Sequence, residues 1–295
     1  MKISPNLREG ASGSFIINQR TIRRPIKFHG IGVHSGENSL VEMYPAEADT
    51  GIIFIKEPEG IAIRATIDNI IHAFHSVGLG TDKVKVFTIE HLMAVLHALG
   101  IDNVYIHVFG EEIPILDGSA KEILDLVLNS GIVELEKVKK YAIITEEVYA
   151  SEDERYIIGY PPDKFELSID YEIYYTRQTI VKQRMIYDHS LEVFTSIAGA
   201  KTFIFEEDLM KIRKNGLGKG IIPNINTIIV GERAHEDLVT HKIIDLLGDL
   251  YLIGYPVLGK IRCYKGGHKL HLKFVKKLKE SIKILKVSEI YGVLE

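Results

Sequence analysis

The chain of 295 residues contains a single cysteine, Cys263, so it cannot form an internal disulfide bond. So little cysteine suits a reducing compartment, and we expect a cytoplasmic protein. Cys263 lies between Arg262 and Tyr264 in an expected strand. A small packing residue is therefore a better interpretation of Cys263 than a nucleophile.

The sequence also has no run of about 20 apolar residues, which a membrane-spanning helix requires. Residues 1–6 carry no apolar signal core, so we expect neither secretion nor stable membrane insertion. The net charge is −4 and gives no broad positive surface, so we expect no nucleic-acid partner.

What the chain does contain is enough apolar sequence, 46% of its residues, for one large domain or two of ordinary size. Polarity rises near residues 136–140, and we place a boundary there, between an N-terminal domain (1–138) and a C-terminal domain (139–295). The first 20 or so residues, with Gly10 and Gly13, look like a loosely held arm.

The two halves have similar orders of elements. Each has strands first, then a helix with a histidine near its start (His91 and His241) and a closing glycine (Gly100 and Gly254). In each half a strand, a glycine-bearing turn and another helix follow. This pattern predicts an α+β fold of two related domains, each a mainly antiparallel sheet with helices packed on one face. Sites tend to form where such halves meet.

Periodicity and end signals locate individual elements. Thr88 can cap a helix over 88–100, and a second helix is expected over 206–214. Alternating apolar residues predict strands, of which the principal ones are 39–44, 51–56, 61–66, 103–108, 141–149, 155–160, 166–175, 179–187 and 260–264.

The helix expected over 240–253 carries His241, Asp245 and Asp249 at intervals of four residues. This spacing places the three side chains along one side of the helix, close to its apolar stripe. An unpaired carboxylate there would cost several kcal/mol, so these groups need cationic, metallic or hydrogen-bonding partners. On this helix alone, a buried His–Asp pair in a satisfied network is the simpler interpretation.

Together with His91, the residues His241 and Asp245 make a set of two histidines and one carboxylate, which is typical of catalytic zinc sites with one position open. Glu90, beside a ligand, could take a proton from water. Asp249 could orient the imidazole of His268 and keep it protonated. Two histidines from separate helices can also be core residues, and such a set also accepts iron or cobalt.

Several segments, in this order along the chain, resemble the family of UDP-3-O-acyl-N-acetylglucosamine deacetylases. The resemblance covers roughly residue 21 to the end. Its segments are Gly30-Ile31-Gly32-Val33-His34-Ser35-Gly36, Thr88-Ile89-Glu90-His91-Leu92, the stretch 112–119, Lys201-Thr202-Phe203, the stretch 241–249, and Gly266-Gly267-His268.

The resemblance implies a zinc amidase that removes the N-acetyl group from an acylated UDP-sugar, the committed step of lipid A synthesis. It implies a site between the two domains, with Zn²⁺ on the three-residue set, Glu90 as general base, and His268, partnered by Asp249, as acid. Thr202 would donate to the oxyanion and Phe203 would pack against the sugar ring. Lys242 would lie near polar groups of the substrate, and an inserted βαβ element at about 203–235 would form the acyl passage.

His34, at the tip of a glycine-rich turn, is either a surface loop residue or a site residue, and we group it with the substrate-binding residues. Lys201 and Thr240 replace arginines usual in the family, and residues 218–240 also differ from its pattern. These departures bear on chain-length preference. The alternatives are a zinc amidase for another N-acetylated sugar or small molecule, and a non-enzymatic zinc-stabilised binding protein. We expect a monomer.

Overall fold

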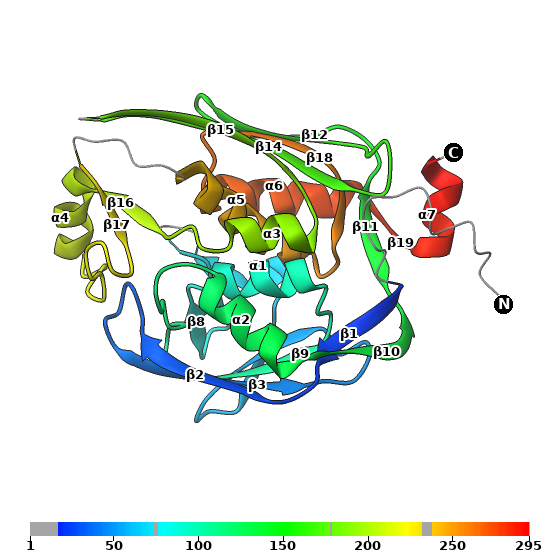
Figure 1. The fold of residues 1–295 in the computed structure, drawn as a ribbon, viewed down its shortest axis with the longest axis horizontal. Coiled ribbons are helices and arrows are strands. Elements are labelled where there is room, and N and C mark those ends of the chain that lie inside the picture. The colour runs from blue at the N-terminus through cyan, green and yellow to red at the C-terminus, as the bar shows by residue number, and fades with distance from the viewer. Residues whose placement is uncertain (1–16, 73–75, 178, 232–237, 295) are drawn as a thin grey trace.

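The computed structural model describes residues 17–72, 76–177, 179–231 and 238–294. Two sheets form the outer layers, and most of the helices lie between them (Figure 1). The fold is the predicted α+β arrangement of two mainly antiparallel sheets, each with helices on one face.

The N-terminal sheet has five strands in the order β2-β3-β9-β4-β5, and only the β4–β9 pair is parallel. Alternating side chains such as Val41 and Met43 are fully buried against the helices. The elements of this half are β1 (Asn18–Ile22), β2 (Ile26–Ile31), β3 (Asn38–Pro45), β4 (Ile52–Lys56), β5 (Ile61–Arg64), the 3₁₀ helix η2 (Ile67–Asn69), β6 (Ile70–His72), β7 (Gly78–Gly80), β8 (Lys85–Phe87), α1 (Glu90–Leu99), β9 (Val104–Phe109), α2 (Lys121–Ser130) and β10 (Ile132–Val138).

The C-terminal sheet has seven strands. Its path is β12-β13-β18-β11-β19, and β14 pairs with both β15 and β18. The predicted alternation along β14 is confirmed, since Ile169, Tyr171 and Ile173 are buried. The elements are β11 (Lys140–Ile144), β12 (Val148–Glu152), β13 (Arg155–Tyr160), β14 (Leu167–Thr176), β15 (Ile180–Asp188), α3 (Leu191–Ile197), α5 (Leu238–Leu250), the 3₁₀ helix η3 (Tyr251–Ile253), β18 (Val257–Tyr264), α6 (His268–Ser281), β19 (Ile282–Lys286) and α7 (Val287–Leu294).

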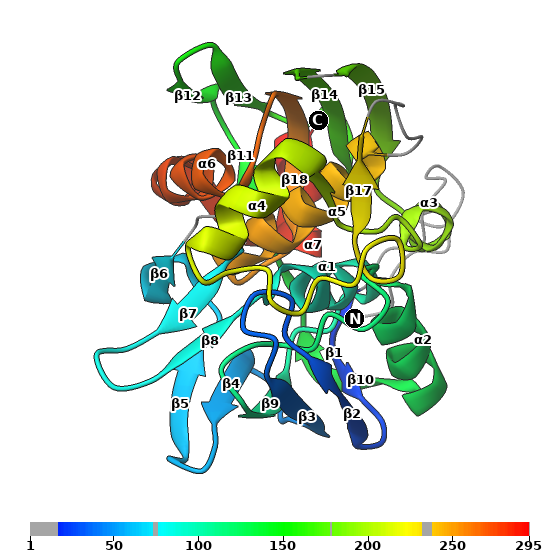
Figure 2. The same cartoon turned by 90° about the vertical axis from the view of Figure 1, so that its left-hand side faces the viewer.

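A small βαβ unit lies at one end of the helical layer (Figures 1 and 2). It consists of β16 (Phe203–Phe205), α4 (Glu206–Lys214) and β17 (Ile228–Val230), and its two strands are parallel. Apolar side chains of this unit pack on Val33 and Ile115 of the N-terminal half, so the unit bridges both halves.

The centre of the molecule is the contact between α1 and α5. Every residue of α1 is buried, and so is every residue of α5 except Lys242. Polar groups on these two helices are therefore removed from water, which makes their partners decisive for stability. Among the described residues, no helix combines the length and the apolar character needed to cross a membrane.

The structure corrects several sequence predictions. Residues 1–16 lie outside the described residues, but Asn18–Arg20 are not part of a loose arm, because they pair with β10. The strand expected over 141–149 is two strands, since β11 pairs with β18 and β19 whereas β12 pairs with β13. The exposed residues 145–147 separate them.

The predicted cap of α1 is also wrong. The capping position is Ile89, and Thr88 instead donates its hydroxyl to Oε1 of Glu112 at 2.7 Å. A φ of 59° at Thr88 turns the backbone out of helical geometry before the cap. The α4 helix spans the predicted residues. The boundary proposed at residue 138 falls between β10 and β11, and the extent of the two domains stays a prediction.

Candidate active site

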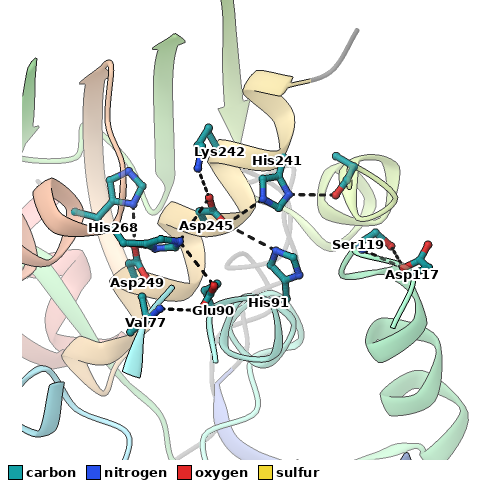
Figure 3. A network of polar contacts seen from close by, with 12 residues as sticks. Val77, Glu90, His91, Asp117, Ser119, His241, Lys242, Asp245, Asp249 and His268 are labelled. Atoms are coloured by element: carbon teal, nitrogen blue, oxygen red, sulfur yellow. Dashed lines mark hydrogen bonds and ion pairs between the residues drawn. The ribbon is translucent and has the colours of Figure 1, made fainter. Parts of the chain in front are cut away.

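His91, at the second position of α1, faces His241 and Asp245 on α5 (Figure 3). Their potential ligand atoms all lie within 4.8 Å of one another, and all three residues are buried. Nε2 of His91 is 3.7 Å from Oδ1 of Asp245, and Nε2 of His241 is 3.4 Å from the same oxygen. The structure thus brings together the three residues singled out in the sequence as a metal set.

The spacing of these atoms fits a metal ion. Ligand atoms about 2.1 Å from a tetrahedral zinc ion lie roughly 3.4 Å from each other. Nδ1 of His241 is 3.3 Å from the backbone oxygen of Ala200, which holds the proton on that nitrogen and leaves Nε2 with its lone pair. Lys242 occupies Oδ2 of Asp245 at 2.8 Å, so Oδ1 is the oxygen that faces the histidines.

The charge states of the protein groups also suit a cation. Burial lowers the pKa of His241 to about 3, so its ring is neutral at pH 7. Burial opposes the charge of Asp245, yet the cationic side chains of Lys242 and His268 hold the pKa of this carboxyl well below its usual range. Burial also lowers the pKa of His91. Two neutral imidazoles and one carboxylate are the protonation states that metal ligands require.

A second histidine–carboxylate group consists of Asp249, further along α5, and of His268 and His271 on α6. Nδ1 of each histidine is 2.8 Å from the same oxygen, Oδ2 of Asp249. This separation is that of a hydrogen bond and is too short for two ligands of one ion. The second group is therefore a hydrogen-bonded triad, in which Asp249 holds His268 as the sequence suggested.

Glu90 and His268 face each other across the space beside the metal set (Figure 3). Nε2 of His268 is 3.8 Å from Oε1 of Glu90 and 3.8 Å from Oδ2 of Asp245. The backbone N–H of Val77 donates to Oε2 of Glu90 at 3.2 Å, which leaves Oε1 directed at the site.

These two groups have opposite pKa shifts. Burial raises the pKa of Glu90 to about 7, with His268 opposing the shift. Burial lowers the pKa of His268, but Asp249 and Asp245 outweigh it and raise the value to about 9. At pH 8 the site therefore holds a carboxylate able to accept a proton and an imidazolium able to donate one.

The remaining predicted residues lie around this centre at different distances. The ring of Phe203 is 6.0 Å from the ring of His241, and Nζ of Lys242 is 5.4 Å from the centre of the Phe203 ring. Thr202 precedes Phe203, and its backbone bonds Gly118 and Ile228. Phe203 and Lys242 thus lie near the metal set, and Thr202 is the sequence neighbour of Phe203.

His34 is placed differently. Its backbone N–H donates to Glu112 at 3.0 Å, and its carbonyl accepts from Lys219 at 3.2 Å. The turn is thereby tied to the start of α1, through Glu112 and Thr88, and to the loop after α4.

Sequence reasoning missed two side chains behind the site. His271 follows His268 by three residues on α6 and could have been found from that spacing. Tyr171 bonds His271 at 2.9 Å but lies 100 residues away in sequence, so no local pattern indicates it.

Comparison with known proteins places these residues in a family context. The sequence profile described as LpxC, UDP-3-O-acyl N-acetylglycosamine deacetylase, matches residues 19–280. A UDP-3-O-acyl-N-acetylglucosamine deacetylase of Thermodesulfovibrio yellowstonii is 35% identical over 271 residues, 89% of this chain and 92% of the relative. Proteins of the same name from Aquifex aeolicus and Bdellovibrio bacteriovorus are 34% and 36% identical, over 90% and 89% of this chain and 94% and 90% of the relatives.

Proposed function

Since this chain belongs to the UDP-3-O-acyl N-acetylglycosamine deacetylase family, we propose that it hydrolyses the N-acetyl group of UDP-3-O-acyl-N-acetylglucosamine. The products are the free amine and acetate, and the reaction is the committed step of lipid A synthesis. The observation that carries the proposal is the pairing of Glu90 with His268 beside an open set of metal ligands. We place the protein in the cytoplasm, acting as a monomer.

We assign Zn²⁺ to His91, His241 and Asp245. The spacing of the donor atoms and their protonation states support this assignment. A bound zinc ion supplies Lewis acidity, which polarises an amide carbonyl and makes water acidic enough to react near neutral pH. Glu90 and His268 have no place in a purely structural zinc site, which speaks against the binding-protein alternative.

The protein groups then divide the proton transfers of amide hydrolysis. Oε1 of Glu90 takes a proton from the attacking water as the new C–O bond forms. Nε2 of His268 gives a proton to the amide nitrogen as the C–N bond breaks, so that the amine leaves neutral. Nδ1 of His268 stays bonded to Asp249, which keeps the ring oriented and charged.

We assign the other predicted residues to substrate. Thr202 donates to the oxyanion that develops on the acetyl carbonyl. Phe203 packs on the glucosamine ring, and Lys242 and His34 bind polar groups of the UDP-sugar. The βαβ unit, with Ile212 and Ile221 buried beside Val33, supplies the apolar surface for the acyl chain.

The test is release of acetate by the purified protein, together with its metal content. We expect acetate from acylated UDP-N-acetylglucosamine and about one zinc ion per chain. His91→Ala and His241→Ala should lose both metal and activity, whereas Glu90→Gln should keep the metal and lose most turnover. Full zinc occupancy in His241→Ala would overturn the ligand assignment.

The choice of substrate has its own comparison. Equal rates on acylated and non-acylated UDP-N-acetylglucosamine would favour an amidase for another N-acetylated sugar. This comparison is informative because Lys201 stands where the family usually has an arginine. Nζ of Lys201 bonds the backbone oxygen of Ile225 at 2.6 Å and lies 3.7 Å from Asp117. An arginine in that position would present a planar fork in place of a point charge.

A further inference from the structure

One carboxylate oxygen of Asp249 accepts hydrogen bonds from two imidazoles. Nδ1 of His268 and Nδ1 of His271 both lie 2.8 Å from Oδ2, and the three side chains are buried. Because a carboxylate only accepts hydrogen bonds, each Nδ1 must carry a proton. Oδ1 of Asp249 has no hydrogen-bond partner within the described part of the chain. The direction of this carboxylate therefore depends on its two contacts at Oδ2.

Tyr171 selects the tautomer of His271. Its hydroxyl is 2.9 Å from Nε2 of His271, and burial raises the pKa of Tyr171 well above the usual range, so the hydroxyl keeps its proton and donates it. Nε2 of His271 must then accept, and the proton of the neutral ring sits on Nδ1. A directed chain results, from the Tyr171 hydroxyl through His271 to Oδ2 of Asp249.

The backbone makes room for this chain at Gly266. A Cβ atom there would lie 2.5 Å from the hydroxyl of Tyr171, 2.8 Å from Nε2 of His271 and 2.4 Å from Sγ of Cys263. At Gly267, by contrast, a Cβ would meet nothing within 4 Å. A residue without a side chain is thus required at Gly266, by the Tyr171–His271 contact, and not at Gly267.

We propose that His271 is a positioning residue for His268: with its ring fixed by Tyr171, it holds Oδ2 of Asp249 where that oxygen accepts from Nδ1 of His268. This inference rests on the proposed role of His268 as proton donor. Without His271, Asp249 would keep one directional contact and could turn its unpaired oxygen toward His268. The imidazole would then lose its alignment with the amide nitrogen, while the metal set and the substrate contacts stay in place.

The experiment compares kcat, KM and zinc content among variants of the full-length enzyme. His271→Leu should lower kcat by about 10- to 100-fold, the usual effect of removing a partner that orients a site residue. KM and zinc content should stay within about two-fold of wild type. His271→Asn should recover most of the lost rate, because its amide nitrogen takes the position of Nδ1 and can donate to Asp249.

Tyr187→Phe is a matched control. It removes another tyrosine hydroxyl from a histidine nitrogen, at 2.8 Å from Nδ1 of His189, without touching Asp249. It should lower the melting temperature and leave kcat unchanged. Tyr171→Phe should lower kcat, because the neutral ring of His271 could then carry its proton on Nε2 and would not donate to Asp249.

A double variant separates this inference from the proposed function. If His271 acts through His268, adding His271→Leu to His268→Ala should cause no further loss of kcat. A His268→Ala enzyme with normal turnover would show that the proton donor itself is misassigned. An inactive His268→Ala enzyme beside a fully active, folded His271→Leu enzyme would overturn only the positioning role.

Should His271→Leu fail to fold, NMR of ¹⁵N-histidine-labelled wild-type enzyme decides the question. The resonances of His271, assigned by their loss in His271→Asn, should show a neutral ring protonated on Nδ1. Protonation on Nε2 would contradict the proposal.

Discussion

Gly248 of α5 lies directly against the backbone of Glu90 at the start of α1. A Cβ atom on Gly248 would be 2.1 Å from the carbonyl oxygen of Glu90 and 2.9 Å from its carbonyl carbon. Glycine costs a helix interior about 1 kcal/mol relative to alanine. In exchange, the two helices approach closely enough for His91 to reach Asp245, which neither helix could arrange alone.

Gly248→Ala should therefore impair the site although the residue carries no functional group. The added methyl forces α1 away from α5, and overpacking of this kind costs about 1–3 kcal/mol. A displacement near 1 Å can lower turnover about 100-fold. Zinc affinity and kcat should both fall. Gly199→Ala, where a Cβ meets nothing within 4 Å, is the control and should match wild type.

Activity against pH should be bell-shaped. Turnover requires Glu90 ionised, so it rises with pH through the pKa of Glu90, about 7 in the protein alone and lower beside a bound cation. It requires His268 charged, so it falls as pH rises through the pKa of His268, about 9. Asp249→Asn removes the charge that favours the imidazolium and should move the basic limb to lower pH. An unmoved basic limb would assign that limb to another group.

Lys139 is a fully buried cation that stabilises the junction between β10 and β11. Its Nζ bonds Oδ1 of Asp102 at 2.6 Å and the backbone oxygen of Gly100 at 2.9 Å. Lys139→Met leaves Asp102 without its cationic partner, with the backbone N–H of Arg20 still donating to Oδ2 at 2.8 Å, and should lower the free energy of unfolding by about 3–5 kcal/mol. The double variant with Asp102→Asn should recover part of this loss in denaturant titrations. Equal stability of Lys139→Met and wild type would show that the ion pair makes no net contribution to the free energy of unfolding.

His97 makes the protein sensitive to acid. Its buried ring is stacked between His189, 5.0 Å away, and Tyr251, 4.8 Å away, and neither ring nitrogen has a hydrogen-bond partner among the described residues. Burial, with His189, lowers its pKa well below the usual value. Below about pH 6.5, His97 therefore binds a proton in the unfolded chain but not in the folded protein. The free energy of unfolding decreases as the pH is lowered below that value.

His97→Phe keeps a flat ring in this stack and removes the titration. The difference between wild type and variant in free energy of unfolding should change by up to about 1.4 kcal/mol per pH unit between pH 6.5 and pH 5. Parallel stability curves for the two proteins would mean that the pKa of His97 is the same in the folded and the unfolded state.

Much of this molecule could be predicted from local pattern. The α+β class and the helix over 206–214 follow from periodicity and end signals, because these depend on residues near one another in sequence. The side-by-side placement of His241 and Asp245 follows from the helical repeat alone. The ligand chemistry of two histidines and one carboxylate grouped His91 with them, and the resemblance to a family, resting on segments from both halves, implied the same set.

Only the tertiary structure decided which groups meet across elements. Thr88 could have capped α1, but its hydroxyl donates to the buried carboxylate of Glu112 instead. Asp249 lies on the same helix face as the metal set, yet α6 brings two imidazoles to it, which makes it a hydrogen-bond acceptor. Such choices are set by which long-range partner satisfies a buried polar group, and local sequence contains no information about that partner.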